Sequence, residues 1–334
     1  MKKMNIKVCA VSLLAAMLLA GCSNSKPAES TTAAPAETTT TAAPADATTK
    51  ADTADGGNAA SASSDGKPEK PTEAQFVKST DAGNSGDVKL EKGDTYAVIT
   101  VRDFGDIKVK LYPELAPYAV YNFVELAKAG TYSGRNFHRI MDDFMIQGGS
   151  ANGQGSGGDS FEGGSFRNEI NTSLRHYYGA FCYGSAMGDM SDQFYIVNNK
   201  KPQTDLDTSY VRVSNTYYSQ AQQFAEAVNS LDPSDENYAA YYNYYKMQFD
   251  FSINYSQGAA YMYETITDDV KKTYEERGGY PGLDGGYTVF GQTVEGFDVI
   301  DKISAVEKSE SSTGEMSVPM KDIIIDKVEI FTME

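Results

Sequence analysis

The sequence predicts a mainly β fold, in which eight antiparallel strands close into a barrel capped by two helices, with a helical, Tyr-rich insertion at residues 198–279. Three observations support this prediction. Eight short apolar or alternating runs, joined by many Gly-rich connections, follow one another from residue 96 onward. Two further stretches have the spacing of amphipathic helices. Thirteen of the 23 Tyr lie between Tyr210 and Tyr280, so the inserted segment has its own composition.

Local patterns define the predicted strands. IKVKLY, at Ile107–Tyr112, alternates apolar and basic residues as a half-buried strand does, and it follows Tyr96–Val101 after a turn at residues 103–106. The other six predicted strands are Asn136–Ile140, Phe144–Gly148, Ala180–Gly184, Gln193–Val197, Tyr287–Gly291 and Ile323–Phe331.

Two helices are predicted beside these strands. Pro117 suits a first helical turn, and Gly130 is placed to end the same helix. The apolar face between them has the spacing i, i+3, i+4 and i+7 and consists of Val120, Phe123, Val124 and Ala127. A second short helix is indicated by Val299, Ile300 and Ile303.

The insertion has an aromatic helix face, formed by Tyr238, Tyr241, Tyr242, Tyr245 and Phe249. Simple packing explains such a face, because Tyr buries a large area and keeps its hydroxyl near water. The alternative is an aromatic surface that binds carbohydrate or peptide.

The first residues predict the compartment. A basic start and a short apolar run are typical of a signal peptide, here residues 1–21. Leu19-Ala20-Gly21-Cys22 resembles the lipobox of bacterial lipoproteins, which implies cleavage before Cys22, lipidation of its thiol and anchoring outside the cytoplasm. An ordinary secreted protein is the alternative. Residues 22–87 are poor in large apolar side chains, so a disordered tether is expected before a domain at residues 88–334.

Composition narrows the function classes. A formal net charge of −17 argues against binding nucleic acid or anionic lipid by charge. Cys182 is the one Cys beyond the signal and lipobox, and its apolar neighbours indicate a core residue. Gly148–Gly158 lacks the Gly-Lys-Ser/Thr ending of a phosphate loop. The sequence has no His and Cys cluster with metal-ligand spacing, and no cofactor is expected.

Four motifs stand in the order found in cyclophilins: GDIKVKLYPELAPYAVYNFVELAKAG, FHRIMDDFMIQGG, SDQFYIV and GLDGGYTVFGQTVEGFDVIDKI. The chain therefore resembles a cyclophilin-type peptidyl-prolyl cis-trans isomerase over nearly all of residues 95–334, except the insertion. The resemblance implies a cyclophilin-like barrel that acts on proline-containing polypeptides.

The resemblance also implies the site residues. Arg139 takes the catalytic position, and the apolar proline pocket falls on Phe144, Met145, Tyr195 and Leu283. The polar positions fall on His138, Gln147 and Gln193. Tyr195 stands where Phe is more common, Tyr287 where many members have His, and Gly282 where the best-known members have Trp, which puts binding of cyclosporin-like peptides in doubt.

The chemistry of prolyl isomerisation agrees with an Arg at the centre. Amide resonance sets a barrier of about 18–20 kcal/mol. A fixed guanidinium that donates to the imide nitrogen lowers this barrier, because its hydrogen bond strengthens as the bond twists. Gln147, on the neighbouring predicted strand, is expected to orient Arg139. His138 is expected to shape the pocket rim by a hydrogen bond, and His176 to be a surface or loop residue.

The sequence thus favours a lipid-anchored isomerase that assists the folding of unfolded or exposed polypeptides outside the cytoplasm. The alternative is a cyclophilin-like binding module without significant isomerase activity, which holds a protein or glycan through the groove and the insertion. A solute-binding lipoprotein is disfavoured by the barrel motifs. The insertion leaves the chain after Tyr195 and returns before Leu283, so we expect it to pack beside the active site as a wall or lid.

Overall fold

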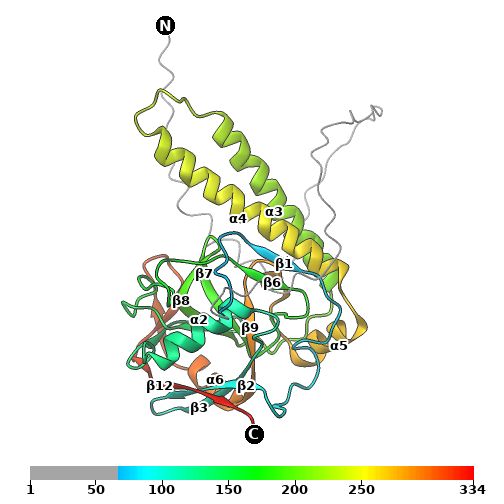
Figure 1. The fold of residues 1–334 in the computed structure, drawn as a ribbon, viewed down its shortest axis with the longest axis vertical. Coiled ribbons are helices and arrows are strands. Elements are labelled where there is room, and N and C mark those ends of the chain that lie inside the picture. The colour runs from blue at the N-terminus through cyan, green and yellow to red at the C-terminus, as the bar shows by residue number, and fades with distance from the viewer. Residues whose placement is uncertain (1–66) are drawn as a thin grey trace, which may run out of the picture. The chain divides into compact units, whose positions relative to one another are not determined.

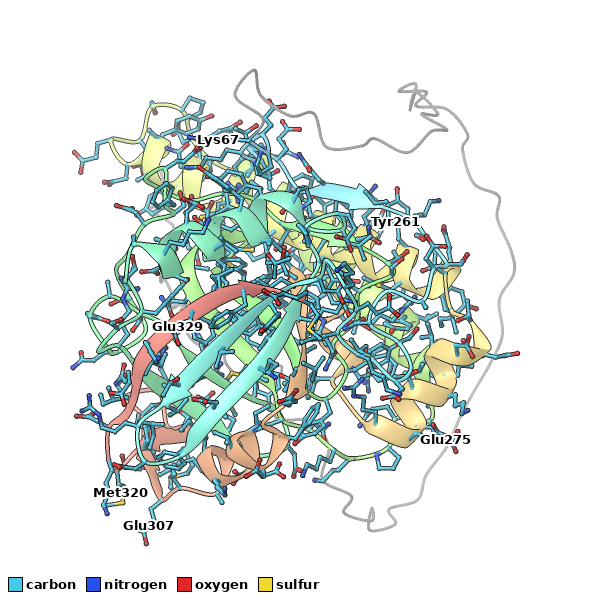
Figure 2. All side chains as sticks on the ribbon, turned by 60° about the horizontal axis from the view of Figure 1, so that its bottom comes forward. Lys67, Tyr261, Glu275, Glu307, Met320 and Glu329 are labelled. Atoms are coloured by element: carbon cyan, nitrogen blue, oxygen red, sulfur yellow. The ribbon has the colours of Figure 1, made fainter. Side chains whose placement is uncertain are left out.

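The computed structural model describes residues 67–334. Within them, eight strands close into a barrel in the order β12-β2-β3-β9-β7-β8-β5-β4 (Figure 1). Every neighbouring pair is antiparallel, which confirms the predicted barrel. The strands are β2 (Thr95–Val101), β3 (Gly105–Leu111), β4 (Asn136–Met141), β5 (Met145–Gly148), β7 (Ala180–Ala186), β8 (Asp189–Val197), β9 (Val289–Glu295) and β12 (Ile323–Thr332). Glu329 marks β12 in Figure 2, where this strand runs beside β2.

Side chains alternate between the inside and the outside of the barrel, because successive residues of a strand point to opposite faces. Ile140 of β4 lies opposite Ile146 of β5, and Ile146 lies opposite Ile196 of β8. All three are fully buried and form part of the core. Arg139 and Gln147, one position away on β4 and β5, are only half-buried and therefore belong to the outer face.

Two helices cover the barrel, as predicted: α2 (Pro117–Lys128) and α6 (Phe297–Ser304). The ring of Phe123 on α2 packs edge-on against Phe181 of β7, with a centroid separation of 5.0 Å. This contact places the apolar face of α2 against the barrel core.

The start of α2 is capped by a residue distant in the sequence. Ala116, the N-cap residue, has no side chain that can accept a hydrogen bond. Instead, the backbone N–H groups of Tyr118 and Ala119 donate to the carboxylate of Glu169, at 3.1 and 2.7 Å. Glu169 begins the short strand β6 (Glu169–Asn171) and is itself buried.

The insertion is helical, as expected, and consists of α3 (Leu206–Asn229), α4 (Tyr238–Glu264) and α5 (Asp268–Arg277). Figure 1 shows α3 and α4 as an antiparallel hairpin that extends away from the barrel. The base of the insertion has its own apolar core, made of Ile170, Tyr177, Leu206, Tyr210, Met262, Val270 and Tyr274.

Packing accounts for only part of the predicted aromatic face of α4. The ring of Tyr245 lies 6.5 Å from that of Phe224 on α3, so this position belongs to the hairpin interface. Tyr241 and Tyr242 are exposed instead.

Residues 67–87 differ from the expectation of a disordered tether. β1 (Gln75–Val77) pairs in parallel with β6, and the ring of Phe76 lies 5.8 Å from Tyr261 of α4. Asn84 is fully buried, and its Nδ2 donates to the backbone oxygen of Arg175 at 2.8 Å. The prediction was wrong here because backbone pairing and a satisfied polar side chain order a segment of low apolar content.

The predicted signal peptide, the lipidated Cys22 and the tether up to residue 66 lie outside the described residues. No helix within residues 67–334 is long and apolar enough to cross a membrane. Cys182 is fully buried, which agrees with its expected place in the core. 

Candidate active site

Arg139 stands in a row of side chains on the outer face of the barrel. In the β-ladder, Arg139 of β4 lies opposite Gln147 of β5, and Gln147 lies opposite Tyr195 of β8. Residues directly opposite each other in an antiparallel ladder share one face of the sheet. The alternation that buries Ile140, Ile146 and Ile196 therefore brings these three predicted site residues together.

The guanidinium of Arg139 is held on two sides. Its Nε and Nη2 lie 2.7 and 2.8 Å from the two carboxylate oxygens of Glu315, and its Nη1 lies 3.4 Å from Oε1 of Gln147. Gln147 in turn donates from Nε2 to Oε1 of Gln193 at 3.1 Å. The predicted polar residues Arg139, Gln147 and Gln193 thus form one connected network, with Glu315 as an additional member.

Glu315 was not expected from the sequence. It precedes β11 (Met316–Pro319), which pairs with β10 (Lys308–Glu310) to form a hairpin beside β4. Figure 2 labels Glu307 and Met320, which flank this hairpin and are joined by a backbone hydrogen bond of 2.9 Å. The hydrogen bond from Arg139 lowers the pKa of Glu315, although partial burial opposes this shift, so the side chain is a carboxylate at neutral pH.

An apolar wall lies beside the guanidinium. Cζ of Arg139 is 5.7 Å from the ring centroid of Phe144, which directly precedes β5. The ring of Tyr280 packs on Phe144 at 4.7 Å and brings the turn η1 (Pro281–Leu283) to this place. Phe144, Tyr195 and Leu283 are 7%, 5% and 5% exposed, whereas Met145 is almost entirely within the core.

His138 is buried beside Arg139. Desolvation, reinforced by the charge of Arg139, lowers the pKa of His138 to about 4. The imidazole is therefore neutral at physiological pH. Its Nδ1 has no hydrogen-bond partner among the described residues, so the expected hydrogen bond at the rim is not found at this atom.

The prediction for His176 was wrong. It is 1% exposed, and its ring bridges two buried groups: Nδ1 lies 2.7 Å from Oδ1 of Asp284 and Nε2 lies 2.8 Å from the hydroxyl of Tyr195. The hydroxyl of Tyr195 therefore has a partner behind the wall. No local pattern signals this role, because the two partners lie 19 and 108 positions from His176.

The insertion contacts the site, as expected. The ring of Tyr287 lies 6.3 Å from Tyr195, and it is also 5.8 Å from Tyr255 of α4. The hydroxyl of Tyr255 donates to the backbone oxygen of Gly282 at 2.5 Å. Tyr217 of α3 stacks on Tyr255 at 4.0 Å. The insertion thus forms a wall beside the predicted proline-binding residues, and its effect on substrate access stays a prediction.

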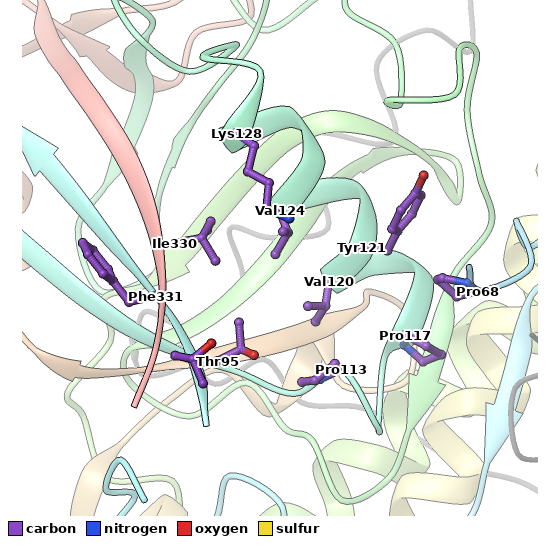
Figure 3. A pocket seen from close by; sticks show the side chains of 11 residues that line it. Pro68, Thr95, Pro113, Pro117, Val120, Tyr121, Val124, Lys128, Ile330 and Phe331 are labelled. Carbon is purple, nitrogen blue, oxygen red and sulfur yellow. The ribbon is translucent and has the colours of Figure 1, made fainter. Parts of the chain in front are cut away.

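A separate cavity of about 580 Å³ lies between α2 and β12 (Figure 3). Its only charged lining residue is Lys128, and none of the predicted site residues lines it. The candidate active site is therefore defined by the chemistry around Arg139 and not by the volume of this cavity. Across residues 67–334, no group of three or more His, Cys, Asp or Glu side chains is placed to hold a metal ion.

Comparisons with known proteins confirm the family that the sequence motifs resemble. A family model described as "Cyclophilin type peptidyl-prolyl cis-trans isomerase/CLD" matches residues 96–330. A Staphylococcus saprophyticus protein that bears the name of a peptidyl-prolyl cis-trans isomerase is 30% identical over 240 residues, which are 71% of this chain and 93% of that protein. A Staphylococcus aureus (strain USA300) protein of the same name is 29% identical over 244 residues, or 72% and 94%.

One solved structure in the comparison is a Cryptosporidium parvum cyclophilin-type peptidyl-prolyl cis-trans isomerase, crystallised in the presence of the dipeptide Ala-Pro. It is 20% identical in sequence and has a TM-score of 0.43. The match covers 71% of this chain and 99% of that one.

Proposed function

The chain belongs to the cyclophilin-type peptidyl-prolyl cis-trans isomerase family, and from this premise we propose that Arg139 catalyses the isomerisation by assisting the twist of the Xaa-Pro bond. The observation that supports this role most directly is the place of Arg139, on the outer face of β4 and 5.7 Å from the ring of Phe144. A proline ring held against Phe144 and Leu283 brings its imide nitrogen toward a charged donor.

The contacts of Arg139 suit this role. A guanidinium has five N–H donors. Glu315 accepts from Nε and Nη2, Sδ of Met141 accepts the second N–H of Nη2 at 3.2 Å, and Gln147 accepts from Nη1. One N–H therefore remains, on Nη1. A fork fixed in this way is pre-organised to donate to the nitrogen as its lone pair develops. The hydrogen bond is stronger in the twisted state than in either ground state, which is the condition for catalysis.

The rate of cis-to-trans isomerisation of a tetrapeptide of the Ala-Ala-Pro-Phe type tests this role. We expect Arg139→Ala to lower kcat/KM by tenfold or more, since a charge-assisted hydrogen bond contributes about 1.5–3 kcal/mol. Arg102→Ala is the matched control, because it also removes a guanidinium that is paired with a carboxylate, here Asp326, but at an exposed position. Equal rates for the two variants would contradict the role of Arg139. No acceleration by the unmodified chain would support the binding-module alternative.

We also propose that the protein acts on proline-containing unfolded or exposed polypeptides outside the cytoplasm, held at the membrane by a lipid on Cys22. The support is the sequence before residue 23, in which a basic start, an apolar run and Leu-Ala-Gly-Cys follow one another. Labelled palmitate and fractionation of cells test this. Label and membrane association should disappear in Cys22→Ser and remain in Ser23→Ala. A membrane fraction that is unchanged in Cys22→Ser would contradict the anchor.

A further inference from the structure

One face of α4 has a regular aromatic pattern. Tyr241, Tyr244, Gln248, Phe251 and Tyr255 are separated by three, four, three and four positions. On a helix this spacing places side chains along a single stripe. We call these five residues the α4 stripe. Its inner residues Phe251 and Tyr255 also pack on Tyr217 of α3, with ring centroids 5.9 and 4.0 Å away, so only the outer part of the stripe lies apart from the hairpin interface.

The inner end of the α4 stripe touches the candidate active site. The ring of Tyr255 lies 5.8 Å from Tyr287 and the ring of Phe251 lies 6.5 Å from it. Tyr287 is in turn 6.3 Å from Tyr195 of the apolar wall. Tyr255 is 2% exposed and supports this junction from below, so the stripe reaches the surface that the proposed function assigns to the residues around proline through the half-buried Phe251 and Tyr287.

The outer end of the α4 stripe is open to solvent. Tyr241 and Tyr244 are 43% and 42% exposed, whereas other Tyr side chains of the insertion, such as Tyr210 and Tyr274, are fully buried. The stripe contains no charged residue. The nearby charges on the helix, Lys246 and Asp250, pair with each other at 2.6 Å. A row of neutral aromatic side chains of this kind favours apolar and aromatic side chains as ligands, and it does not attract a charged polymer.

We propose that the α4 stripe binds an extended, apolar segment of the same substrate polypeptide whose proline occupies the Arg139 site. This inference rests on the proposed isomerase function and adds a substrate class to it: unfolded chains with apolar residues several positions from the proline. Phe251 and Tyr241 are ten helical residues apart, or about 15 Å. An extended chain covers this distance in about five residues. A tetrapeptide therefore leaves the outer stripe empty, whereas a peptide of eight to twelve residues reaches it.

The experiment uses the full chain and peptides of four, eight and twelve residues that share one Xaa-Pro core. The longer peptides carry Leu, Val and Phe on either the N-terminal or the C-terminal side of the proline. We expect kcat/KM for one of the two long series to exceed that of the tetrapeptide by about tenfold, from one or two aromatic contacts. Tyr241→Ser combined with Tyr244→Ser should abolish this gain and leave the tetrapeptide rate as it was.

Tyr263→Ser is the matched control. Tyr263 is 45% exposed on the same helix but falls outside the three-and-four spacing. The inference is overturned if peptide length has no effect, if the control loses the gain equally, or if the double variant loses tetrapeptide activity in the same proportion. It is also overturned if the stripe binds a soluble peptidoglycan fragment and not the long peptides.

Binding separates this inference from the proposed function. A twelve-residue peptide in which Ala replaces Pro can be titrated by calorimetry without any isomerisation. We expect its Kd to rise about tenfold in the double variant, and an unchanged Kd overturns the inference. Failure of the proposed function would appear differently, as no acceleration of any proline peptide by the unmodified chain.

Discussion

Asp284 is a buried charge with four hydrogen-bonding contacts at the junction of barrel and insertion, and its replacement by Asn should destabilise the protein strongly. The carboxylate is fully buried. Oδ1 accepts from the backbone N–H of His176 at 2.8 Å and lies 2.7 Å from Nδ1 of the same residue. Oδ2 accepts from the hydroxyls of Tyr210 and Tyr274, both at 2.5 Å. Nη1 of the buried Arg175 lies 4.0 Å away.

The magnitude follows from these contacts. Asp284→Asn removes the charge that balances Arg175 and places an NH₂ donor where the carboxylate now accepts hydrogen bonds. Removing one partner of a buried ion pair costs about 3–5 kcal/mol. A domain of this size loses about 2–4 °C of Tm per kcal/mol, so we expect a decrease of roughly 6–20 °C.

The assay is urea denaturation at pH 7, followed by circular dichroism, together with a thermal scan. Asp298→Asn is the matched control, because Asp298 pairs with Lys302 at an exposed position and should change the free energy of unfolding by less than about 1 kcal/mol. A change of less than about 1 kcal/mol for Asp284→Asn would refute the reasoning, since it would mean that Arg175 does not need this charge.

The pH dependence provides a second check on Asp284. Burial alone raises the pKa of its carboxyl group, but the hydrogen bond and charge of His176 and the charge of Arg175 outweigh burial and hold this pKa below its ordinary value of 3.8. A lowered pKa means that the stabilisation is present above pH 3.8 and is lost as the pH falls through the folded-state value. The difference in the free energy of unfolding between the unmodified protein and Asp284→Asn should therefore stay constant from pH 5 to 8.

Three further predictions concern the site and the start of α2. Glu315→Gln should lower tetrapeptide kcat/KM by about threefold to tenfold through a loosened Arg139, with Glu310→Gln of the same hairpin as the control, and equal rates for both would contradict the role of Glu315. Burial raises the pKa of Glu169 from 4.5 to about 7, although the hydrogen bonds from its two backbone donors act to lower it. The free energy of unfolding should therefore fall by about 3 kcal/mol as the pH rises from 4.5 to 7. Urea denaturation should show this slope in the unmodified chain, and a slope that persists in Glu169→Gln would assign it to another group. Because His138 is neutral above its pKa of about 4, it should not titrate between pH 5.5 and 8, and kcat/KM should stay constant over this range. A rise in kcat/KM near pH 6.5 that disappears in His138→Asn would disprove this.

The strands and the core of the site could be predicted because their signals are local. Alternation along β4 and β5 places Ile140 and Ile146 inside and Arg139 and Gln147 outside, and this follows from the sequence period alone. The family motifs then assigned chemistry to Arg139. The helical insertion was also predictable, since its composition and spacing differ from those of the barrel.

Contacts between distant segments could not be predicted in the same way. Glu315 meets Arg139 across 176 positions, and no local pattern distinguishes it from the other acidic residues of its hairpin. Asp284 lies within the motif GLDGG, yet its partners Tyr210 and Tyr274 come from the insertion. Asn84 looked like a tether residue because composition does not show whether a polar side chain finds buried partners.

The pairing of β1 with β6 has a mechanical consequence. A pull on the chain before residue 67 would first meet the contacts that precede β1, in which Lys67 lies 6.0 Å from the ring of Tyr121 on α2 and the backbone oxygen of Pro71 accepts from the N–H of Arg167 at 2.9 Å. β1 pairs with β6 through three residues of parallel ladder. It is joined to α4 by the ring contact of Phe76 with Tyr261, and Lys78 beside it donates a hydrogen bond to Glu264. Tension that passes the contacts before β1 would therefore be shared at β1 between β6 and the base of α4, so the N-terminal segment would couple the insertion to the barrel under load.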